Sequence, residues 1–411
     1  MGKPRPTCQP KEARVRNVRE VSLGLNKKIA QDEARRCPQC AVATCLSGCP
    51  LGIDIPGFIR LLREGDTVLA LERIKKENPF PAICGRICPA PCEQACVFHA
   101  DGEPIAIRAL ERFAADFGQS KLEKPRLHSP RGKKVAIIGS GPAGMSAAYY
   151  LAKMDLSVTI FEAAHQPGGL LRYAIPEYRL PQKVLDEQFS QLKSLGVEIQ
   201  TDAVVGRTLM IDELFMGGFS AVLLATGASL PRFSDLPGSG LAGVYYDVEF
   251  LNRLQEVNKE DVLVAARRQR MPAAKTVIVG GGPAAFDAAR LCLRLGSETQ
   301  VVLDGFEEQA GVGDEILKET REEGIEIHSM QALEIVGDEN GFVRGVKCRE
   351  VDEVPILLEA RTVIIANGQR PNPSVMDNME KVFACANSGS VVEAIAGGKT
   401  AAQKIIQYLQ L

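Results

Sequence analysis

Two glycine-rich segments far apart in the chain repeat one pattern, and this repeat limits the possible folds more than any other feature. They are Val135-Ala-Ile-Ile-Gly-Ser-Gly-Pro-Ala-Gly144 and Val277-Ile-Val-Gly-Gly-Gly-Pro-Ala-Ala285. Each predicts a short apolar strand, a tight glycine turn and the start of a helix. A weaker pair, residues 222–227 and 363–368, adds one further apolar strand after each segment. This alternating order predicts one dinucleotide-binding domain inserted into another.

The first segment has the spacing of a pyrophosphate-binding loop. Gly139 permits the tight turn, Gly141 lets the backbone approach a pyrophosphate, and Gly144 allows the helix to pack closely on the strand. The next predicted strand, residues 158–161, ends in Glu162, whose carboxylate is placed to bind ribose hydroxyls. An ordinary tight turn is the alternative, but the strand before the loop and the helix after it favour a dinucleotide site.

Cysteine is the unusual residue of the N-terminal region, where eight of the twelve cysteines lie between Cys37 and Cys96. Their spacing is Cys-x2-Cys-x4-Cys-x3-Cys-Pro from Cys37, and Cys-x3-Cys-Pro-x2-Cys-x3-Cys from Cys84. Close spacing and a Cys-Pro ending are typical of ferredoxin-like cluster ligands. A structural zinc site is the alternative, but it needs two short pairs, which these intervals fit less well.

Composition indicates a cytoplasmic protein. A chain of 411 residues with a net charge of −2 has room for two or three ordinary domains and gives no reason to expect nucleic acid or a membrane surface as partner. No apolar run reaches 18 residues, and the basic start, residues 1–16, lacks the apolar core of a signal peptide. We therefore expect no membrane insertion, and metal ligation rather than disulfides at the cysteines.

These features, with four further motifs, resemble a known family over nearly the whole chain. The sequence is similar to the small, flavin-carrying subunit of glutamate synthase, to the N-terminal half of dihydropyrimidine dehydrogenase and to the large subunit of ferredoxin–NADP transhydrogenase. The further motifs are Arg35-Arg-Cys-Pro-Gln-Cys40, Cys84-Gly-Arg-Ile-Cys-Pro89, Gly168-Gly-Leu-Leu-Arg-Tyr-Ala-Ile-Pro-Glu-Tyr-Arg-Leu-Pro181 and Gly368-Gln-Arg-Pro-Asn372.

The resemblance implies an α/β fold in which two nested Rossmann-like dinucleotide-binding domains follow an α-helical iron–sulfur domain. The helical domain, residues 1–130, would carry two [4Fe–4S] clusters. The FAD-binding domain would consist of residues 131–230 and 364–411. The NAD(P)H-binding domain, residues 231–363, would be inserted between its two parts.

The family's pattern also implies which side chains hold the clusters. One cluster would be held by Cys37, Cys40, Cys45 and Cys96, and the other by Cys49, Cys88, Cys92 and, as fourth ligand, Glu111. Two alternatives stay open. Cys84 is the fourth ligand that cysteine counting alone would choose, and Glu111 would then be a surface residue on an amphipathic helix.

Candidate cofactor contacts lie in and around the two glycine turns and in the glycine-rich segment 168–181. That segment has too many glycines and prolines for regular structure and is too apolar for a solvated loop, so it is suited to wrap a flat ring system. The candidate cofactor-binding residues are Gly139, Gly141, Ala143, Gly144, Glu162, Gly169, Leu170, Arg172, Ile175, Arg179, Thr226, Gly227, Gly280, Gly282, Ala285, Asp304, Gly368 and Asn387.

The chain departs from the family at two of these positions. The predicted strand 300–303 ends in Asp304, where the family usually has an arginine pair suited to a 2′-phosphate. A carboxylate there repels that phosphate, so we expect NAD(H) to be favoured over NADP(H). The alternative is that Asp304 only caps a turn. Asn387 stands where the family has an aspartate near the flavin ribityl chain, and its amide still forms hydrogen bonds.

The expected function is electron transfer between a nicotinamide nucleotide and a partner. Hydride exchange would take place between the nicotinamide and FAD, and the clusters would carry single electrons onward. The expected partner is another redox protein, either a large subunit or an electron carrier such as ferredoxin. The rival function is a relay adaptor that bears clusters in a larger complex and has a degenerate nucleotide site. No side chain is assigned a catalytic role.

Overall fold

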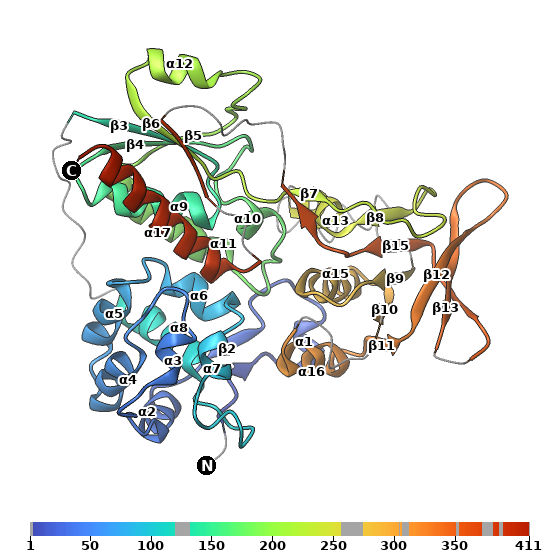
Figure 1. The fold of residues 1–411 in the computed structure, drawn as a ribbon. Helices are drawn as coiled ribbons and strands as arrows, with labels where there is room; N and C mark the ends of the chain where they lie inside the picture. Colours follow the sequence, from blue (N-terminus) through green and yellow to red (C-terminus); the bar gives the residue numbers. More distant parts are fainter. Residues whose placement is uncertain are drawn as a thin grey trace.

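The structure is a computed structural model that describes residues 3–119, 132–255, 274–303, 305, 312–350, 353–371, 381–385 and 389–410. Figure 1 shows a helical unit, residues 3–119, below one parallel sheet and beside a second, each sheet being accompanied by helices. Within the described residues, no helix is long and apolar enough to cross a membrane.

The helical unit consists of short amphipathic helices around an apolar core. Three helices begin at a capping side chain, because Asn26, Asp54 and Asp66 each accept a hydrogen bond from a backbone N–H in the first turn. The elements are β1 (Thr7–Cys8), α1 (Lys11–Arg14), β2 (Ser22–Gly24), α2 (Lys27–Arg36), α3 (Thr44–Ser47), α4 (Ile55–Glu64), α5 (Thr67–Lys75), α6 (Pro81–Ile87), α7 (Pro91–Gln94) and α8 (Ile107–Gly118). The last of them, α8, packs against α5 and α6.

The first α/β unit is built on a five-stranded parallel sheet with the order β17-β6-β3-β4-β5. Its strands are rich in Val, Ile, Leu and Phe and are mostly buried, as expected of a parallel sheet that helices cover on both faces. Its strands are β3 (Lys134–Ile138), β4 (Ser157–Phe161), β5 (Glu198–Gln200), β6 (Phe219–Leu224) and β17 (Val382–Ala384). Its helices are α9 (Pro142–Ala152), α10 (Leu170–Tyr173), α11 (Gln182–Ser194), α12 (Ile211–Met216) and α17 (Val391–Tyr408).

The second α/β unit runs from β8 to β15 and contains another parallel sheet, with the order β11-β10-β9-β15-β8. Strands β12, β13 and β14 form a separate antiparallel sheet, and β12 and β13 project from the unit in Figure 1. The strands are β8 (Val244–Tyr246), β9 (Lys275–Val279), β10 (Glu298–Leu303), β11 (Glu326–Ser329), β12 (Gln331–Gly337), β13 (Val343–Arg349), β14 (Ile356–Glu359) and β15 (Thr362–Ile365). Helices α13 (Asp247–Gln255), α15 (Pro283–Arg294) and α16 (Asp314–Glu322) accompany them, and β7 (Leu230–Pro231) pairs with β16 (Gln369–Arg370) where the chain passes between the units.

Helix α17 closes the first α/β unit by packing directly on α9. A Cβ built at Gly398 would lie 2.1 Å from the carbonyl oxygen of Ala143, so only glycine permits this approach. Nearby, the hydroxyl of Ser146 donates to the carbonyl oxygen of Ile395 at 2.7 Å. Residues late in the chain therefore pack on the helix that follows the first glycine turn.

This topology confirms the predicted α/β fold, in which two nested dinucleotide-binding units follow a helical unit in the sequence. The chain leaves the first sheet after β6, forms the second sheet, and returns to the first sheet as β17. Strand β15 ends at Ile365 and so crosses the predicted boundary between residues 363 and 364. The domain boundaries themselves stay a prediction.

Lys75 joins the helical unit to the first α/β unit and provides a test of this interface. Its Nζ donates to Oε1 of Gln119 and to Oε1 of Gln191, each at 3.0 Å, and burial lowers its pKa to about 8. The unfolded chain therefore binds a proton that the folded protein releases between about pH 8 and 10.5, so this lysine destabilises the fold below pH 8 and ceases to do so as the pH rises.

We predict that the melting temperature of Lys75→Met, minus that of wild type, is highest at pH 7. This difference should become smaller or more negative as the pH rises toward 10. Apparent melting temperatures of both proteins at pH 7, 8.5 and 10 measure the trend. Lys76→Met is the matched control, because Lys76 is the exposed neighbour on the same helix end. A difference between wild type and Lys75→Met that does not change with pH contradicts the prediction.

Candidate functional site

Four partly exposed cysteines form one group in the helical unit, called here the outer group: Cys37, Cys40, Cys45 and Cys96. Burial raises the pKa of Cys37 and Cys45, and the neighbouring thiols of Cys40 and Cys96 raise both further. Helices α3 and α7 pack closely and bring the distant Cys96 to the first run. At their contact a Cβ on Gly48 would lie 2.7 Å from the Cβ of Ala95.

A second group, of four cysteines and one glutamate, lines a pocket inside the helical unit. This inner group consists of Cys49, Cys84, Cys88, Cys92 and Glu111. Cys84, Cys88, Cys92 and Glu111 are all less than 10% exposed, and burial raises the pKa of Cys88 to about 12. All five are thiols or a carboxylic acid, so the pocket combines apolar surroundings with potential anionic ligands.

The inner pocket thus contains Cys49, Cys88, Cys92 and Glu111, and it also contains Cys84. All twelve cysteines are free. Across the described ranges, no three Cys, His, Asp or Glu side chains converge as they would around one metal ion. The assignment of individual ligands stays a prediction.

Glu111 is held by a partner that the sequence did not point to. Asn78 is fully buried, and its Nδ2 donates to Oε1 of Glu111 at 2.6 Å while its Oδ1 accepts from the backbone N–H of Phe80 at 3.0 Å. Burial raises the pKa of Glu111 to about 8, and the hydrogen bond from Asn78 opposes this shift. Glu111 is therefore an oriented, buried carboxyl group and not a surface residue of α8.

The inner pocket adjoins the first α/β unit. Val392, in the first turn of α17, lines the pocket together with the cysteines. The helix begins at Ser390, whose Oγ accepts from the backbone N–H of Glu393 at 3.4 Å. The same helix packs on α9, which follows the first glycine turn, so the first α/β unit reaches from its dinucleotide loop to the cysteine pocket.

The three glycines of the first turn have different surroundings. Gly139 has φ +104°, and a Cβ there would lie 2.4 Å from the carbonyl oxygen of Ala225. A Cβ on Gly144 would lie 2.0 Å from the carbonyl oxygen of Gly139. A Cβ on Gly141 would meet no protein atom within 4 Å. Gly139 and Gly144 are therefore required by the fold, whereas the space above Gly141 is open to a ligand.

Glu162 lies at the carboxyl end of β4, beneath this turn. Its Oε2 accepts from the backbone N–H of Ser140 at 3.0 Å and from the Ser140 hydroxyl, and its Oε1 accepts from the N–H of Ala164 at 2.8 Å. The Ser140 hydroxyl also accepts from the N–H of Gly168 at 2.8 Å. Ser140, which the motif left as an unspecified position, thus connects the turn to the segment 168–181.

The two arginines of that segment bond to protein atoms. Arg172 is buried and donates to Oε1 of Gln182 at 2.7 Å and to Oδ1 of Asp186 at 2.6 Å. Arg179 forms an ion pair with Asp287 of α15, with Nη1 and Oδ2 2.6 Å apart. Their predicted role as cofactor contacts stays untested, and each has a structural partner that local sequence patterns did not identify.

The remaining predicted residues lie at the first glycine turn, next to other elements of the α/β units, or outside the described ranges. Gly169 adjoins the first turn, since a Cβ on it would lie 3.1 Å from the Cα of Gly141. Ala143 is the second residue of α9, Leu170 begins α10, and Ile175 follows α10. Thr226 and Gly227 follow β6. Gly368 precedes β16 and has φ +88°. Asp304 and Asn387 lie outside the described residues.

The second glycine turn repeats the geometry of the first. Gly280 has φ +139°, and a Cβ there would lie 2.3 Å from the carbonyl oxygen of Ala366. A Cβ on Gly282 would meet no atom within 4 Å, and Ala285 is fully buried against the sheet. The backbone N–H groups at the start of α15 therefore face an open position, as those of α9 do.

Comparison with known families agrees with this division of the chain. Residues 14–122 match dihydropyrimidine dehydrogenase domain II, described as a 4Fe–4S cluster domain. Residues 133–398 match the pyridine nucleotide-disulphide oxidoreductase family. The solved structure of Mycobacterium tuberculosis FprA in complex with NADPH has a TM-score of 0.56 and 18% identity, and covers 68% of this chain and 85% of FprA. That likeness supports the fold alone.

Several curated relatives, including the two that follow, have a higher sequence identity to this chain than FprA has. The glutamate synthase [NADPH] small chain of Mycobacterium tuberculosis is 37% identical over 299 residues, which cover 71% of this chain and 61% of the relative. The chain therefore spans less than two thirds of that protein. An NAD-dependent dihydropyrimidine dehydrogenase subunit PreT homolog of Salmonella typhi is 31% identical over 420 residues, which cover 95% of this chain and 97% of the relative.

The family resemblance expected from the motifs is confirmed by these matches. Two open dinucleotide turns lie in the part that matches the oxidoreductase family, and both cysteine groups lie in the part that matches the cluster domain. The chain belongs to the pyridine nucleotide-disulphide oxidoreductase family and carries, ahead of its flavoprotein part, a 4Fe–4S domain of the dihydropyrimidine dehydrogenase type.

Proposed function

We propose that this protein passes electrons between a nicotinamide nucleotide and a partner redox protein, using FAD and two [4Fe–4S] clusters. When bound, these groups supply hydride acceptance and one-electron transfer. The observation that carries the proposal is the inner pocket, which is lined by four cysteines and Glu111 of the helical unit together with Val392 of the first α/β unit. That contact supports an electron route that connects the FAD site to the inner group and then to the more exposed outer group.

The residues proposed to hold the inner cluster are Cys49, Cys88, Cys92 and Glu111. The burial of Cys88, Cys92 and Glu111 fits metal ligation, because it disfavours their free anions, and bound iron would take the place of the protons. Asn78 fixes the orientation of Glu111 through the 2.6 Å hydrogen bond, as outer-sphere partners of metal ligands do. Cys84 is the competing fourth ligand.

The outer group, Cys37, Cys40, Cys45 and Cys96, is proposed to hold the second cluster and to face the partner. Its thiols are only half-buried, and the apolar side chains of Val42 and Val97 in the same loops are 81% and 47% exposed. Exposed apolar side chains near a redox group are suited to a protein contact. The relatives are named as a chain of glutamate synthase and a subunit of dihydropyrimidine dehydrogenase, which supports a partner subunit or an electron carrier such as ferredoxin.

The first glycine turn is proposed to bind FAD, and the second the nicotinamide nucleotide. The open space above Gly141 and Gly282 fits a pyrophosphate held by backbone N–H groups. We infer that NAD(H) is favoured, because Asp304 follows β10 in the sequence at the position that binds the ribose hydroxyls in NAD-specific folds. The relatives include one named for NADPH and one named for NAD, so family membership leaves this preference open.

The cluster proposal predicts about eight iron atoms in anaerobically prepared protein. Glu111→Ala should alter only one of two cluster signals in electron paramagnetic resonance, because the other ligand set is separate from it. Cys84→Ala should leave both signals intact. Zinc in place of iron refutes the clusters, whereas loss of a signal in Cys84→Ala with none lost in Glu111→Ala makes Cys84 the ligand.

Replacement by alanine should have different effects at Gly141 and at Gly144. Gly141 has φ −65° and ψ −179°, which alanine adopts without strain, so Gly141→Ala should fold normally but lose most of its FAD because the Cβ occupies the pyrophosphate position. Gly144→Ala should lower the melting temperature of the protein itself, because its Cβ would lie 2.0 Å from the carbonyl oxygen of Gly139. Flavin absorbance per chain and thermal melting of the FAD-free protein distinguish them. Full FAD content in Gly141→Ala contradicts the assignment.

The nucleotide proposal predicts faster flavin reduction by NADH than by NADPH. An unpaired carboxylate facing a 2′-phosphate costs a few kcal/mol, on the order of a hundredfold in affinity. Stopped-flow flavin absorbance at matched concentrations measures both rates, and Asp304→Ser should reduce the preference. Faster reduction by NADPH in wild type refutes the preference, and no reduction by either nucleotide supports the relay adaptor.

A further inference from the structure

Tyr178, near the end of the segment 168–181, is inserted into the second α/β unit. Its side chain is 1% exposed and belongs to an apolar cluster formed mainly by that unit, including Phe250 and Phe286. Its hydroxyl donates to the carbonyl oxygen of Asp287 at 3.0 Å. The segment that adjoins the proposed FAD turn thus continues into the core of the unit that carries the nucleotide turn.

Two arginines of α15 fix the ring of Tyr178. The guanidinium carbons of Arg290 and Arg294 lie 5.1 and 4.2 Å from its centroid, within the range of cation–π contacts. Glu323 holds both arginines, with N–O distances of 2.6 and 2.7 Å, and its side chain is fully buried. Although burial opposes it, Arg294 and Arg290 lower the pKa of Glu323 to about 2, so the carboxylate is charged at neutral pH.

The adjacent Arg179 forms the second bond between these units. Its partner, Asp287, is 4% exposed and lies two residues after Ala285, in the helix whose first N–H groups form the nucleotide turn. At the other end of the segment, Gly169 abuts Gly141 of the FAD turn. The segment therefore bonds to both units, through the Gly168 N–H that donates to Ser140 of the FAD turn and through the ion pair of Arg179 with α15.

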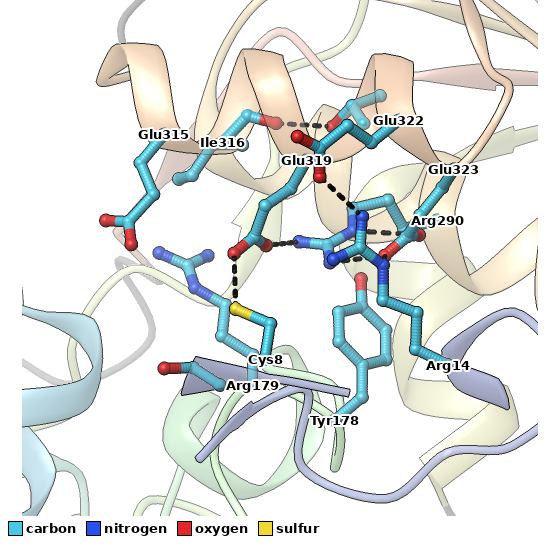
Figure 2. A network of polar contacts seen from close by, with 12 residues as sticks. Cys8, Arg14, Tyr178, Arg179, Arg290, Glu315, Ile316, Glu319, Glu322 and Glu323 are labelled. Carbon is cyan, nitrogen blue, oxygen red and sulfur yellow. Dashed lines mark hydrogen bonds and ion pairs between the residues drawn. The ribbon is translucent and has the colours of Figure 1, made fainter. Parts of the chain in front are cut away.

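The helical unit reaches the same junction through its N-terminal segment. Arg14 pairs with Glu322 at 3.0 Å and with Glu323 at 3.2 Å, and the backbone N–H of Val21 donates to the carbonyl oxygen of Tyr178 at 2.8 Å. Figure 2 shows Arg14, Arg290 and Glu323 gathered beside the Tyr178 ring, with Arg179 close by. All three units therefore meet at one buried polar junction.

We propose that Tyr178 and Arg179 are positioning residues that fix the nucleotide turn relative to the FAD turn and so set the geometry for hydride transfer. The inference rests on the proposed function, since it concerns the step between the two bound cofactors. Hydride transfer between groups on two units is sensitive to their relative placement, and a displacement of about 1 Å costs up to roughly a hundredfold in rate. Arg179 acts here through Asp287 and not as a cofactor contact.

The test compares Arg179→Met, Arg179→Lys and wild type, all as full chains loaded with FAD and clusters. The rate constant of flavin reduction at saturating NADH should fall about tenfold or more in Arg179→Met, with Arg179→Lys between it and wild type. FAD content, the dissociation constant for NADH and flavin reduction by dithionite should stay within about twofold of wild type, because neither cofactor site is altered. Lys275→Met, which removes an exposed ion pair with Glu359, is the control and should match wild type.

Each other outcome overturns the proposal. Unchanged flavin reduction by NADH shows that the ion pair does not position the units. Loss of FAD or weaker binding of NADH shows that Arg179 contacts a cofactor. If Arg179→Met does not fold, Arg179→Lys decides, since it keeps the charge but loses the guanidinium geometry, and a wild-type rate in it refutes the inference. Failure of the proposed function is distinct, because wild-type flavin would then be reduced by neither nucleotide.

Discussion

The helical unit depends on one constraint, which is that three thiols and a carboxyl group are buried in its apolar interior, beside the partly exposed Cys49. Ile53, Ile55 and Phe58 line the same pocket as Cys88 and Glu111, so an anion formed there has no water to solvate it. The chain meets this constraint in one of two ways: the acids keep their protons, or a positively charged iron centre replaces them. Helices α6, α7 and α8, which carry or flank most of these groups, already share an apolar core with Ile83, Ile87 and Leu110. Metal bound in the pocket would add a second link among them.

The packing of helices in the first α/β unit depends on backbone segments that approach one another closely. Gly144 lies against the carbonyl oxygen of Gly139, and Gly398 lies against that of Ala143, so α9 is held tightly between the sheet and α17. Because α17 also supplies Val392 to the cysteine pocket, a rigid stack of backbone connects the dinucleotide turn to the helical unit. Such a stack leaves little freedom for the distance between the two sites.

Local sequence rules predicted the nested sheets and the surroundings of the glycine turns, because a strand followed by a glycine turn and a helix has few structural solutions. Family resemblance was needed to single out Glu111 as a candidate ligand, since nothing in the residues around it indicates a buried carboxyl group. The partners Asn78 and Asp287 were not predicted, because each comes from a distant part of the chain. Cys84 lies on α6 and Cys88 is the residue that ends this helix, and both line the same pocket, so spacing alone does not separate a ligand from its neighbour.

The return of the chain to the first sheet has a consequence for how the protein is made. Strand β17 pairs with β6, and α17 covers α9, yet the whole second α/β unit is encoded between these partners. During synthesis the inserted unit emerges while its host still lacks one strand and one helix. Tyr178 leaves the ribosome before most of the core that encloses it has been made. The cysteines of the inner pocket likewise emerge before Val392, which also lines that pocket. The host unit therefore cannot complete its sheet and its helix packing until the whole inserted unit has been synthesised.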